Sequence, residues 1–289
     1  MKAQVVKAIL NNQVIISAVK STTMVQKAIK MHDLSPVCSA ALGRTITMGA
    51  LMSAQLKNET DYLSATIKAD GPIGSIVVCA DGRGNVKGYC DNPHVETSFN
   101  DENHLNVGQA VGRNGQLTVV KNIGLKTPAI GTVKLVSGEI AQDFAQYYAT
   151  SEQQPCAIAL GVKLQKGKCV SAGGVMIAPM PDCDPNLLYD IETVCYAMDE
   201  ISYQYETQTA HEIITKFFSQ LGELVFTETK QVDFKCDCLT KRIEKVILSI
   251  GKQEANEIIA QNGQVEVKCH FCNKNYVFDA EKIEKLFNK

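Results

Sequence analysis

The sequence predicts an α+β protein with an N-terminal mixed α/β-sheet core domain, a helical linker region and a small C-terminal domain. Between Tyr62 and Val136, short apolar runs alternate with Gly, Asp and Asn, which is typical of a meander of strands. The segment Pro179–Asp182 interrupts this pattern, and amphipathic helical sequences follow it. Four cysteines then lie in two close pairs near the C-terminus.

We place the core domain at residues 1–179, an acidic helical linker region at 180–232 and the C-terminal domain at 233–289. The chain of 289 residues is long enough for more than one domain, and 45% hydrophobic with 21% charged residues is a globular composition. The linker region carries two basic and ten acidic side chains, whereas the core domain carries 17 basic and 12 acidic ones. Opposite charge would allow the two parts to dock on each other. A solvated acidic helix face explains the same pattern equally well.

The core domain begins with two β-branched runs, Gln4–Leu10 and Val14–Lys20, which predict strands joined by a hairpin turn at Asn11-Asn12. Ser35-Pro36 has the residue types of a helix N-cap and first helical position, so we expect a buried helix over Val37–Leu56. The remaining expected elements are one helix, Glu139–Thr150, and the strands Leu63–Ala69, Gly74–Ala80, Val86–Cys90, Gln116–Asn122, Ile130–Val136, Ala157–Leu164 and Val170–Ile177.

The linker region contains two amphipathic helical stretches, the first of which begins at Asp184 or Pro185. Such apolar stripes usually pack against a neighbouring domain. The alternative is a surface that is covered in one state of the protein and exposed in another. The two stripes consist of Leu188, Ile191, Cys195 and Met198, and of Ile213, Ile214, Phe217, Phe218 and Leu221.

The C-terminal domain has about 57 residues, which are few for an independent core, so a bound metal ion is physically sensible there. The expected elements are a helix Leu239–Ile250 ended by Gly251, a helix Glu254–Gln261 ended by Asn262-Gly263, a hairpin of Val265–Lys268 and Tyr276–Phe278, and a helix Ala280–Phe287 capped by Asp279.

The four cysteines form the motifs Cys236-Asp-Cys238 and Cys269-His-Phe-Cys272, with 30 residues between them. Two close pairs of sulfur donors suit a tetrahedral Zn²⁺ ion. Alternate side chains of a plain strand lie roughly 7 Å apart, so the backbone must bend within the first motif. The sequence therefore predicts one Zn²⁺ with the ligands Cys236, Cys238, Cys269 and Cys272. His270 is an alternative ligand, although four sulfurs already complete the tetrahedron.

The same thiols could instead form disulfides and release the metal, which makes the site a candidate redox switch. Zinc joins two chain segments 30 residues apart, a constraint worth about 4 kcal/mol. Disulfides between sequence neighbours close very short loops worth under about 2 kcal/mol each, and they do not join the two halves. Such oxidation would unfold the C-terminal domain. Cross-pair disulfides such as Cys236–Cys269 would keep the link and the domain intact.

The remaining seven cysteines lie mostly in apolar runs, and we expect each to be a small buried hydrophobic residue. They are Cys38, Cys79, Cys90, Cys156, Cys169, Cys183 and Cys195.

No pattern for an active site is found, and we expect no enzyme. The chain has no Gly-x-Ser-x-Gly or His-Glu-x-x-His motif, and Gly82–Asn85 is typical of a β-turn rather than a phosphate loop.

Neither charge nor hydropathy suggests nucleic-acid or membrane binding, because no domain is strongly basic and no apolar run approaches about 18 residues. Polar residues interrupt the first apolar run, so we expect no signal peptide and a cytoplasmic location.

Two other functions compete with a redox switch. The C-terminal domain could be a purely structural zinc ribbon of a nucleic-acid or partner-binding protein, although its net charge of +1 argues against nucleic acid. A metalloenzyme is a weaker alternative, because four cysteine ligands leave zinc no open position for water.

The sequence resembles the heat-shock protein 33 family, the redox-regulated bacterial chaperones, over essentially the whole chain. The two cysteine motifs carry the strongest resemblance. Further matches are Gly138–Phe144, Tyr147-Tyr148 and Ser151–Pro155, in which Gln142 stands where an acidic residue is expected.

The resemblance implies a reduced, zinc-bound, inactive state and an oxidised, active holdase that needs no ATP. It implies that oxidation forms Cys236–Cys238 and Cys269–Cys272, that zinc leaves, and that the C-terminal domain and the preceding linker unfold. It further implies that the clients are unfolded or misfolded proteins and that the active form is a homodimer. The residues alone suggest the switch, and only the resemblance suggests a chaperone.

Overall fold

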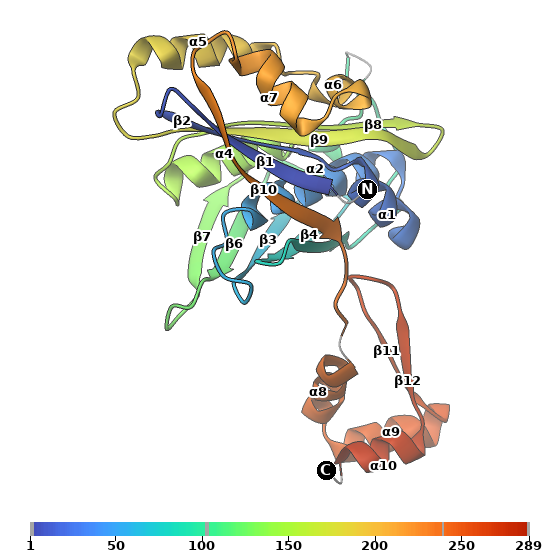
Figure 1. The fold of residues 1–289 in the computed structure, drawn as a ribbon. Coiled ribbons are helices and arrows are strands. Elements are labelled where there is room, and N and C mark those ends of the chain that lie inside the picture. The colour runs from blue at the N-terminus through green and yellow to red at the C-terminus, as the bar shows by residue number, and fades with distance from the viewer. Residues whose placement is uncertain (1–2, 102–103, 239, 288–289) are drawn as a thin grey trace. The chain divides into compact units, whose positions relative to one another are not determined.

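The computed structural model describes residues 3–101, 104–238 and 240–287. It has the expected α+β class and divides into two compact units, Met1–Lys235 and Cys236–Lys289 (Figure 1). The three-part division at residues 179 and 232 stays a proposal, since the linker region lies within the first unit in this two-unit division.

In the described part of the first unit, ten strands form one sheet in the order β7-β6-β3-β4-β5-β10-β1-β2-β9-β8. Strand β10 pairs antiparallel with β1 and, over Asp233–Phe234 only, parallel with β5, so it joins two antiparallel halves. The strands are β1 (Ala3–Leu10), β2 (Val14–Lys20), β3 (Tyr62–Ala69), β4 (Ile76–Asp81), β5 (Asn85–Cys90), β6 (Gly115–Asn122), β7 (Ala129–Lys134), β8 (Ala157–Gln165), β9 (Lys168–Pro179) and β10 (Leu224–Phe234).

One face of the β1-β2-β9-β8 half packs on helices α1 (Thr22–His32) and α2 (Pro36–Ser53) (Figure 1). Helix α2 is the centre of the main core, because nearly all of its side chains are buried. The short helix α3 (Val107–Val111) contacts α2, and α4 (Ala141–Thr150) packs on β7 and β8.

The opposite face of the same strands is covered by the linker helices α5 (Pro185–Tyr196), α6 (Ile201–Thr207) and α7 (Ala210–Phe218) (Figure 1). Strand alternation separates the two faces, since Val5 and Met176 belong to the main core and Val6 and Val175 to the core under the linker helices. We call this second group the linker core; its sheet residues are Val6, Ala8, Leu10, Val14, Ile16, Ala18, Val175 and Ile177.

The second unit contains helices α8 (Thr240–Ile250), α9 (Lys252–Asn262) and α10 (Ala280–Phe287) and the hairpin of β11 (Val265–Lys268) and β12 (Asn275–Phe278). Its core is small and consists of Ile243, Ile247, Ala255, Val265, Phe278, Ile283 and Leu286. The backbone N–H of Lys282 donates to the Asp279 carboxylate over 2.9 Å, which confirms the expected cap of the last helix.

Most expected elements are confirmed within a few residues, including the hairpin turn, where Asn11 and Asn12 have φ values of 49° and 55°. Helix α2 ends at Ser53 rather than Leu56, and Ser35 caps it without a side-chain hydrogen bond. Leu239, the expected start of α8, lies outside the described residues. Four elements were not expected: helices α1, α3 and α6 and strand β10.

The apolar stripes of the linker helices are confirmed with one change. Ile213, Ile214 and Phe218 are fully buried on the sheet. In α5, Leu187 is buried whereas Leu188 is half-buried, because the helix is rotated slightly from the expected orientation.

Candidate metal centre

Two segments of the second unit bring the four cysteines together. Cys236 and Cys238 lie just after β10, in a stretch without regular secondary structure, so the backbone bends as the Cys-x-Cys spacing requires. Cys269 begins the turn between β11 and β12: its N–H donates to the Lys274 carbonyl over 3.0 Å, and its own carbonyl accepts from Asn273 over 2.8 Å. Asn273 has a φ of 56°, a left-handed conformation that suits a tight turn, and the Cys272 N–H contacts the Cys269 carbonyl over 3.4 Å.

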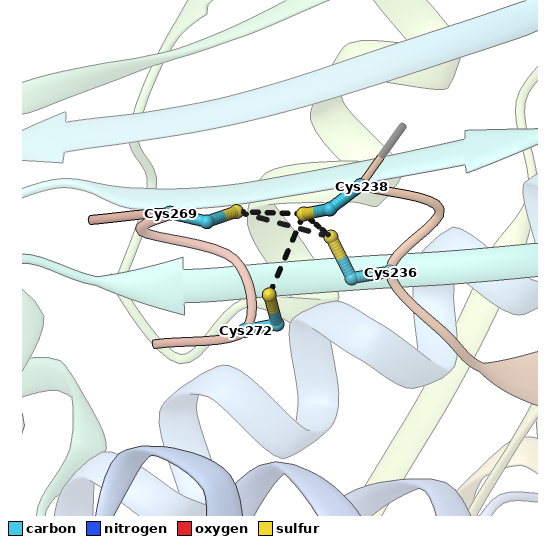
Figure 2. Close-up of side chains that lie close together, drawn as sticks. All are labelled: Cys236, Cys238, Cys269 and Cys272. Carbon is cyan, nitrogen blue, oxygen red and sulfur yellow. Dashed lines mark hydrogen bonds between the residues drawn. The ribbon is translucent and has the colours of Figure 1, made fainter. Parts of the chain in front are cut away.

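The four sulfur atoms lie within 4.8 Å of one another (Figure 2). The Sγ atom of Cys238 is 2.9 Å from that of Cys236, 3.0 Å from that of Cys269 and 3.4 Å from that of Cys272. The Cys236 and Cys269 sulfurs are 3.9 Å apart. All four are free thiols and half-buried. The expected four-cysteine cluster therefore exists, and among the described residues it consists of these four cysteines without His270.

The donor set fits a metal ion of the size and softness of zinc. A tetrahedral site with zinc–sulfur bonds of about 2.3 Å needs sulfurs about 3.8 Å apart. The Cys236–Cys269 pair already has this spacing at 3.9 Å, and the closer pairs need to separate by less than about 1 Å. Four sulfur donors favour zinc over hard cations such as Mg²⁺, which bind oxygen.

The thiols influence one another electrostatically. Burial, followed by a hydrogen bond with Cys238, raises the pKa of Cys236 well above its usual range. Burial also raises the pKa of Cys238 to about 11. Burial alone would raise the pKa of Cys269, but hydrogen bonds from Cys238 and from backbone N–H groups outweigh it and lower that pKa. Without a cation, the cluster therefore holds protons that a bound metal would displace.

Tyr276 is a further residue of the four-cysteine site, through its contact with Cys238. It lies on β12, and a hydrogen bond between its side chain and the Cys238 sulfur offsets a small part of the rise that burial causes in the pKa of that thiol. Burial, followed by this contact, raises the pKa of Tyr276 to about 12. Its position on the hairpin that carries Cys269 and Cys272 gives it this reach, and nothing in the cysteine spacing marks it.

The other seven cysteines lie outside this cluster, in the first unit. Cys38, Cys90 and Cys169 are buried, as expected, whereas the other four are half-buried. Within the described residues, no helix combines the length and the apolarity that a bilayer-spanning segment requires.

Comparisons with known proteins agree with this arrangement. A family model described as "Hsp33 protein" matches residues 3–279. The chain is 43% identical over 278 residues to the 33 kDa chaperonin of Alkaliphilus oremlandii, covering 96% of this chain and 93% of the relative. It is 40% identical over 291 residues to the 33 kDa chaperonin of Alkaliphilus metalliredigens, covering both chains completely.

A solved structure shows the same fold. The crystal structure of the 33 kDa chaperonin (heat shock protein 33 homolog) of Thermotoga maritima superposes with a TM-score of 0.90 at 31% sequence identity, covering 99% of this chain and 98% of that one. A family model over nearly the whole chain and relatives of this identity and coverage leave one assignment: the chain belongs to the heat-shock protein 33 family of chaperones.

Proposed function

We propose that this chaperone is an ATP-independent holdase controlled by the redox state of Cys236, Cys238, Cys269 and Cys272. In the reduced state these four residues hold one Zn²⁺ and the protein is inactive. In the oxidised state they form the disulfides Cys236–Cys238 and Cys269–Cys272, the metal is released, and the C-terminal unit unfolds. The clients are unfolding or oxidatively damaged proteins.

The observation that carries this proposal is the convergence of four free sulfurs from two distant segments within 4.8 Å. When bound, Zn²⁺ would link these segments and keep the sulfurs as thiolates. The unit that contains them has only a small core, formed by one or two buried apolar residues from each of α8, α9, α10 and the hairpin. Such a unit depends on the link for much of its stability.

Oxidation would remove this link through the cysteines themselves. Each neighbouring pair of thiolates gives two electrons to one peroxide molecule and forms one S–S bond, while the two peroxide oxygens take up two protons from solvent and leave as two waters. The Cys236 and Cys238 sulfurs already lie 2.9 Å apart, so this pair needs little movement. The disulfides leave no thiolate to hold a cation, and neither of them joins the Cys236–Cys238 segment to the hairpin.

The linker core supplies a surface that could bind clients. Helices α5–α7 cover an apolar sheet face that includes Leu10, Val14 and Ile16, each with 0% exposure. Strand β10 leads directly from this sheet to Cys236. Unfolding that spreads from the C-terminal unit into the linker helices would expose the sheet face, and contiguous apolar surface of this kind binds unfolded chains.

Light scattering of a heat-denatured client protein tests the proposal. Equal amounts of reduced, zinc-loaded protein and peroxide-treated protein are added without ATP. We expect suppression of scattering by the oxidised protein only. Equal protection in both states would remove redox control, and no protection in either would remove the holdase.

The accompanying proposals concern partners and location. We propose a homodimer in the active state, a cytoplasmic location and no binding to nucleic acid or membranes. The alternative of a nucleic-acid-binding zinc ribbon predicts retention of nucleic acid in a low-salt filter-binding assay, which the holdase proposal does not.

A further inference from the structure

A second pair of cysteines meets inside the first unit, separate from the four-cysteine site. Cys38 lies in the first turn of α2 and Cys90 is the last residue of β5. Both are buried, with exposed fractions of 0% and 7%. Both thiols donate to one atom, the backbone carbonyl oxygen of Asn92, over 3.3 Å from Cys38 and 3.8 Å from Cys90. Residues 52 positions apart in the chain thus flank a single oxygen.

Hydrogen bonds hold this meeting point in place. Asn92 donates from its backbone N–H to the Ile73 carbonyl over 3.0 Å and from its side chain to the Pro72 carbonyl over 2.7 Å. The next carbonyl, of Pro93, accepts from the Ser35 N–H over 2.8 Å at the start of α2. The loop that carries the shared acceptor is therefore tied to the helix that carries Cys38.

When Cys38 loses the proton that it donates to the Asn92 carbonyl, neighbouring groups stabilise the resulting thiolate. A hydrogen bond with Cys90 lowers the pKa of Cys38 to about 6, against the opposing effect of burial, and the nearby Ser35 hydroxyl lowers it further. That hydroxyl oxygen is buried and has no hydrogen-bond partner among the described residues, so it is available to a sulfur anion. The same contact and burial raise the pKa of Cys90, which therefore keeps its proton as the donor of the pair.

The pair lies close behind the wall of a surface cavity. The loop segment Asn92–Ser98, together with Pro72, Gln109 and Ala110, lines an open surface cavity of about 720 Å³. Asn92, whose carbonyl contacts both sulfurs, belongs to the wall of this cavity. The backbone at Asn92 therefore separates the cavity from the two thiols.

We propose that Cys38 and Cys90 form a disulfide when the protein meets hydrogen peroxide. The Cys38 thiolate attacks one peroxide oxygen, the O–O bond breaks, and Cys38 becomes a sulfenic acid while the released hydroxide takes a proton to form water. The Cys90 sulfur then attacks the Cys38 sulfur, its proton leaves with the sulfenic hydroxyl as a second water, and the S–S bond forms. Two thiols are oxidised and one peroxide is reduced.

Disulfide formation between Cys38 and Cys90 would affect stability differently from disulfide formation at the four-cysteine site. A Cys38–Cys90 bond would close a long loop and fasten α2 to the sheet, whereas the neighbouring disulfides of the C-terminal unit close loops of three or four residues. The core would be held together under the same conditions that loosen the C-terminal unit. The inference does not depend on the proposed chaperone cycle, since it concerns two residues in the other unit.

Peptide mapping of the full-length wild-type protein tests the pair directly. Tryptic peptides 31–44 and 88–113 each contain a single cysteine, Cys38 and Cys90 respectively. After peroxide treatment, alkylation in denaturant and digestion without reductant, we expect these peptides as one joined species that dithiothreitol separates. If both peptides are recovered singly and alkylated, at peroxide doses that fully oxidise Cys236, Cys238, Cys269 and Cys272, the proposal is wrong. Either cysteine joined to a different partner overturns it as well.

Two variants sharpen the result. Cys38→Ser should leave Cys90 alkylatable after peroxide. Cys169→Ser is the matched control, because Cys169 is a buried thiol of the same unit whose pKa burial raises to about 12, and this variant should keep the joined peptide. Loss of the joined peptide in both variants would show that it reflects general unfolding and would overturn the assignment. If Cys38→Ser fails to fold, the wild-type peptide map alone decides.

Discussion

The hydroxyl of Tyr205 on α6 donates a hydrogen bond to the carbonyl oxygen of Gly174 on β9 over 2.9 Å, and Tyr205 is completely buried. The neighbouring Gly173 permits this contact, because an added Cβ there would lie 2.4 Å from the Tyr205 ring. The tyrosine is thus an anchor of the linker helices on the sheet. Its removal should loosen the cover over the linker core without any oxidation.

Tyr205→Ala should make the reduced protein partly active. Loss of a buried aromatic side chain lowers the free energy of unfolding by about 3–5 kcal/mol. Because Tyr205 belongs to the linker core, this loss weakens the packing of α6 on the sheet rather than the main core. We expect measurable suppression of client light scattering by the reduced, zinc-loaded variant. Tyr203→Ala is the matched control, since Tyr203 lies on the same helix but is 48% exposed, and it should stay inactive when reduced. A reduced Tyr205→Ala protein with no activity would show that the linker core is not a client surface.

Cys269→Ser should abolish metal binding. Serine offers a hard hydroxyl in place of a soft thiolate, so the site loses one of its four sulfur donors and with it most of its affinity for zinc. Elemental analysis of the purified variant should find close to no zinc, against one ion per wild-type chain. Cys195→Ser, in the linker helices, should retain the wild-type zinc content. Full zinc in Cys269→Ser would place the metal elsewhere.

Zinc affinity should fall as the pH falls. Cys236 and Cys238 have raised pKa values, so both are protonated between pH 6 and 8 in the metal-free protein and must release protons on binding. Release of at least these two protons predicts a loss of about a hundredfold or more in affinity per pH unit as the solution is acidified. Competition with a chelator of known pH dependence at pH 6, 7 and 8 measures the slope. An affinity that does not change across this range would contradict thiolate ligation by these residues.

Asp143→Asn should destabilise the first unit. The buried Asp143 carboxylate accepts backbone N–H groups of Val136, Ser137, Gly138 and Ile140 over 2.7–3.3 Å, and it thereby holds Ile140 at a φ of 78°. An amide nitrogen in place of one oxygen would face these donors, at a cost of about 2–4 kcal/mol. Denaturant titration of the reduced protein should show the loss. Asp70→Asn, at an exposed loop carboxylate, should change stability by less than about 1 kcal/mol.

Local residue types were enough to predict many elements of the fold. The hairpin turn at Asn11-Asn12, the start of α2 at Ser35-Pro36 and the cap at Asp279 each depend on a few adjacent residues. Helix α1 also carries a readable signal, because Met24, Val25, Ala28 and Ile29 recur at helical spacing. The β-branched residues around Thr22 obscure this pattern, because they favour a strand.

Strand β10 could not be predicted in this way. Its sequence has many polar residues, and its conformation depends on pairing with β1 and β5, which are more than 100 residues away in the chain. The four-cysteine cluster could be predicted in part. The spacing predicts two half-sites, but their meeting within 4.8 Å depends on the turn between β11 and β12, and the role of Tyr276 depends on the same hairpin.

The most direct test of the account combines zinc stoichiometry with hydrogen–deuterium exchange before and after peroxide treatment. We expect one zinc per reduced chain with protected amides in α8, α9 and α10, and no zinc with rapid exchange throughout these helices after oxidation. Reductant together with zinc should restore the protection. An oxidised, zinc-free protein whose C-terminal amides stay as protected as in the reduced form would contradict the proposed switch.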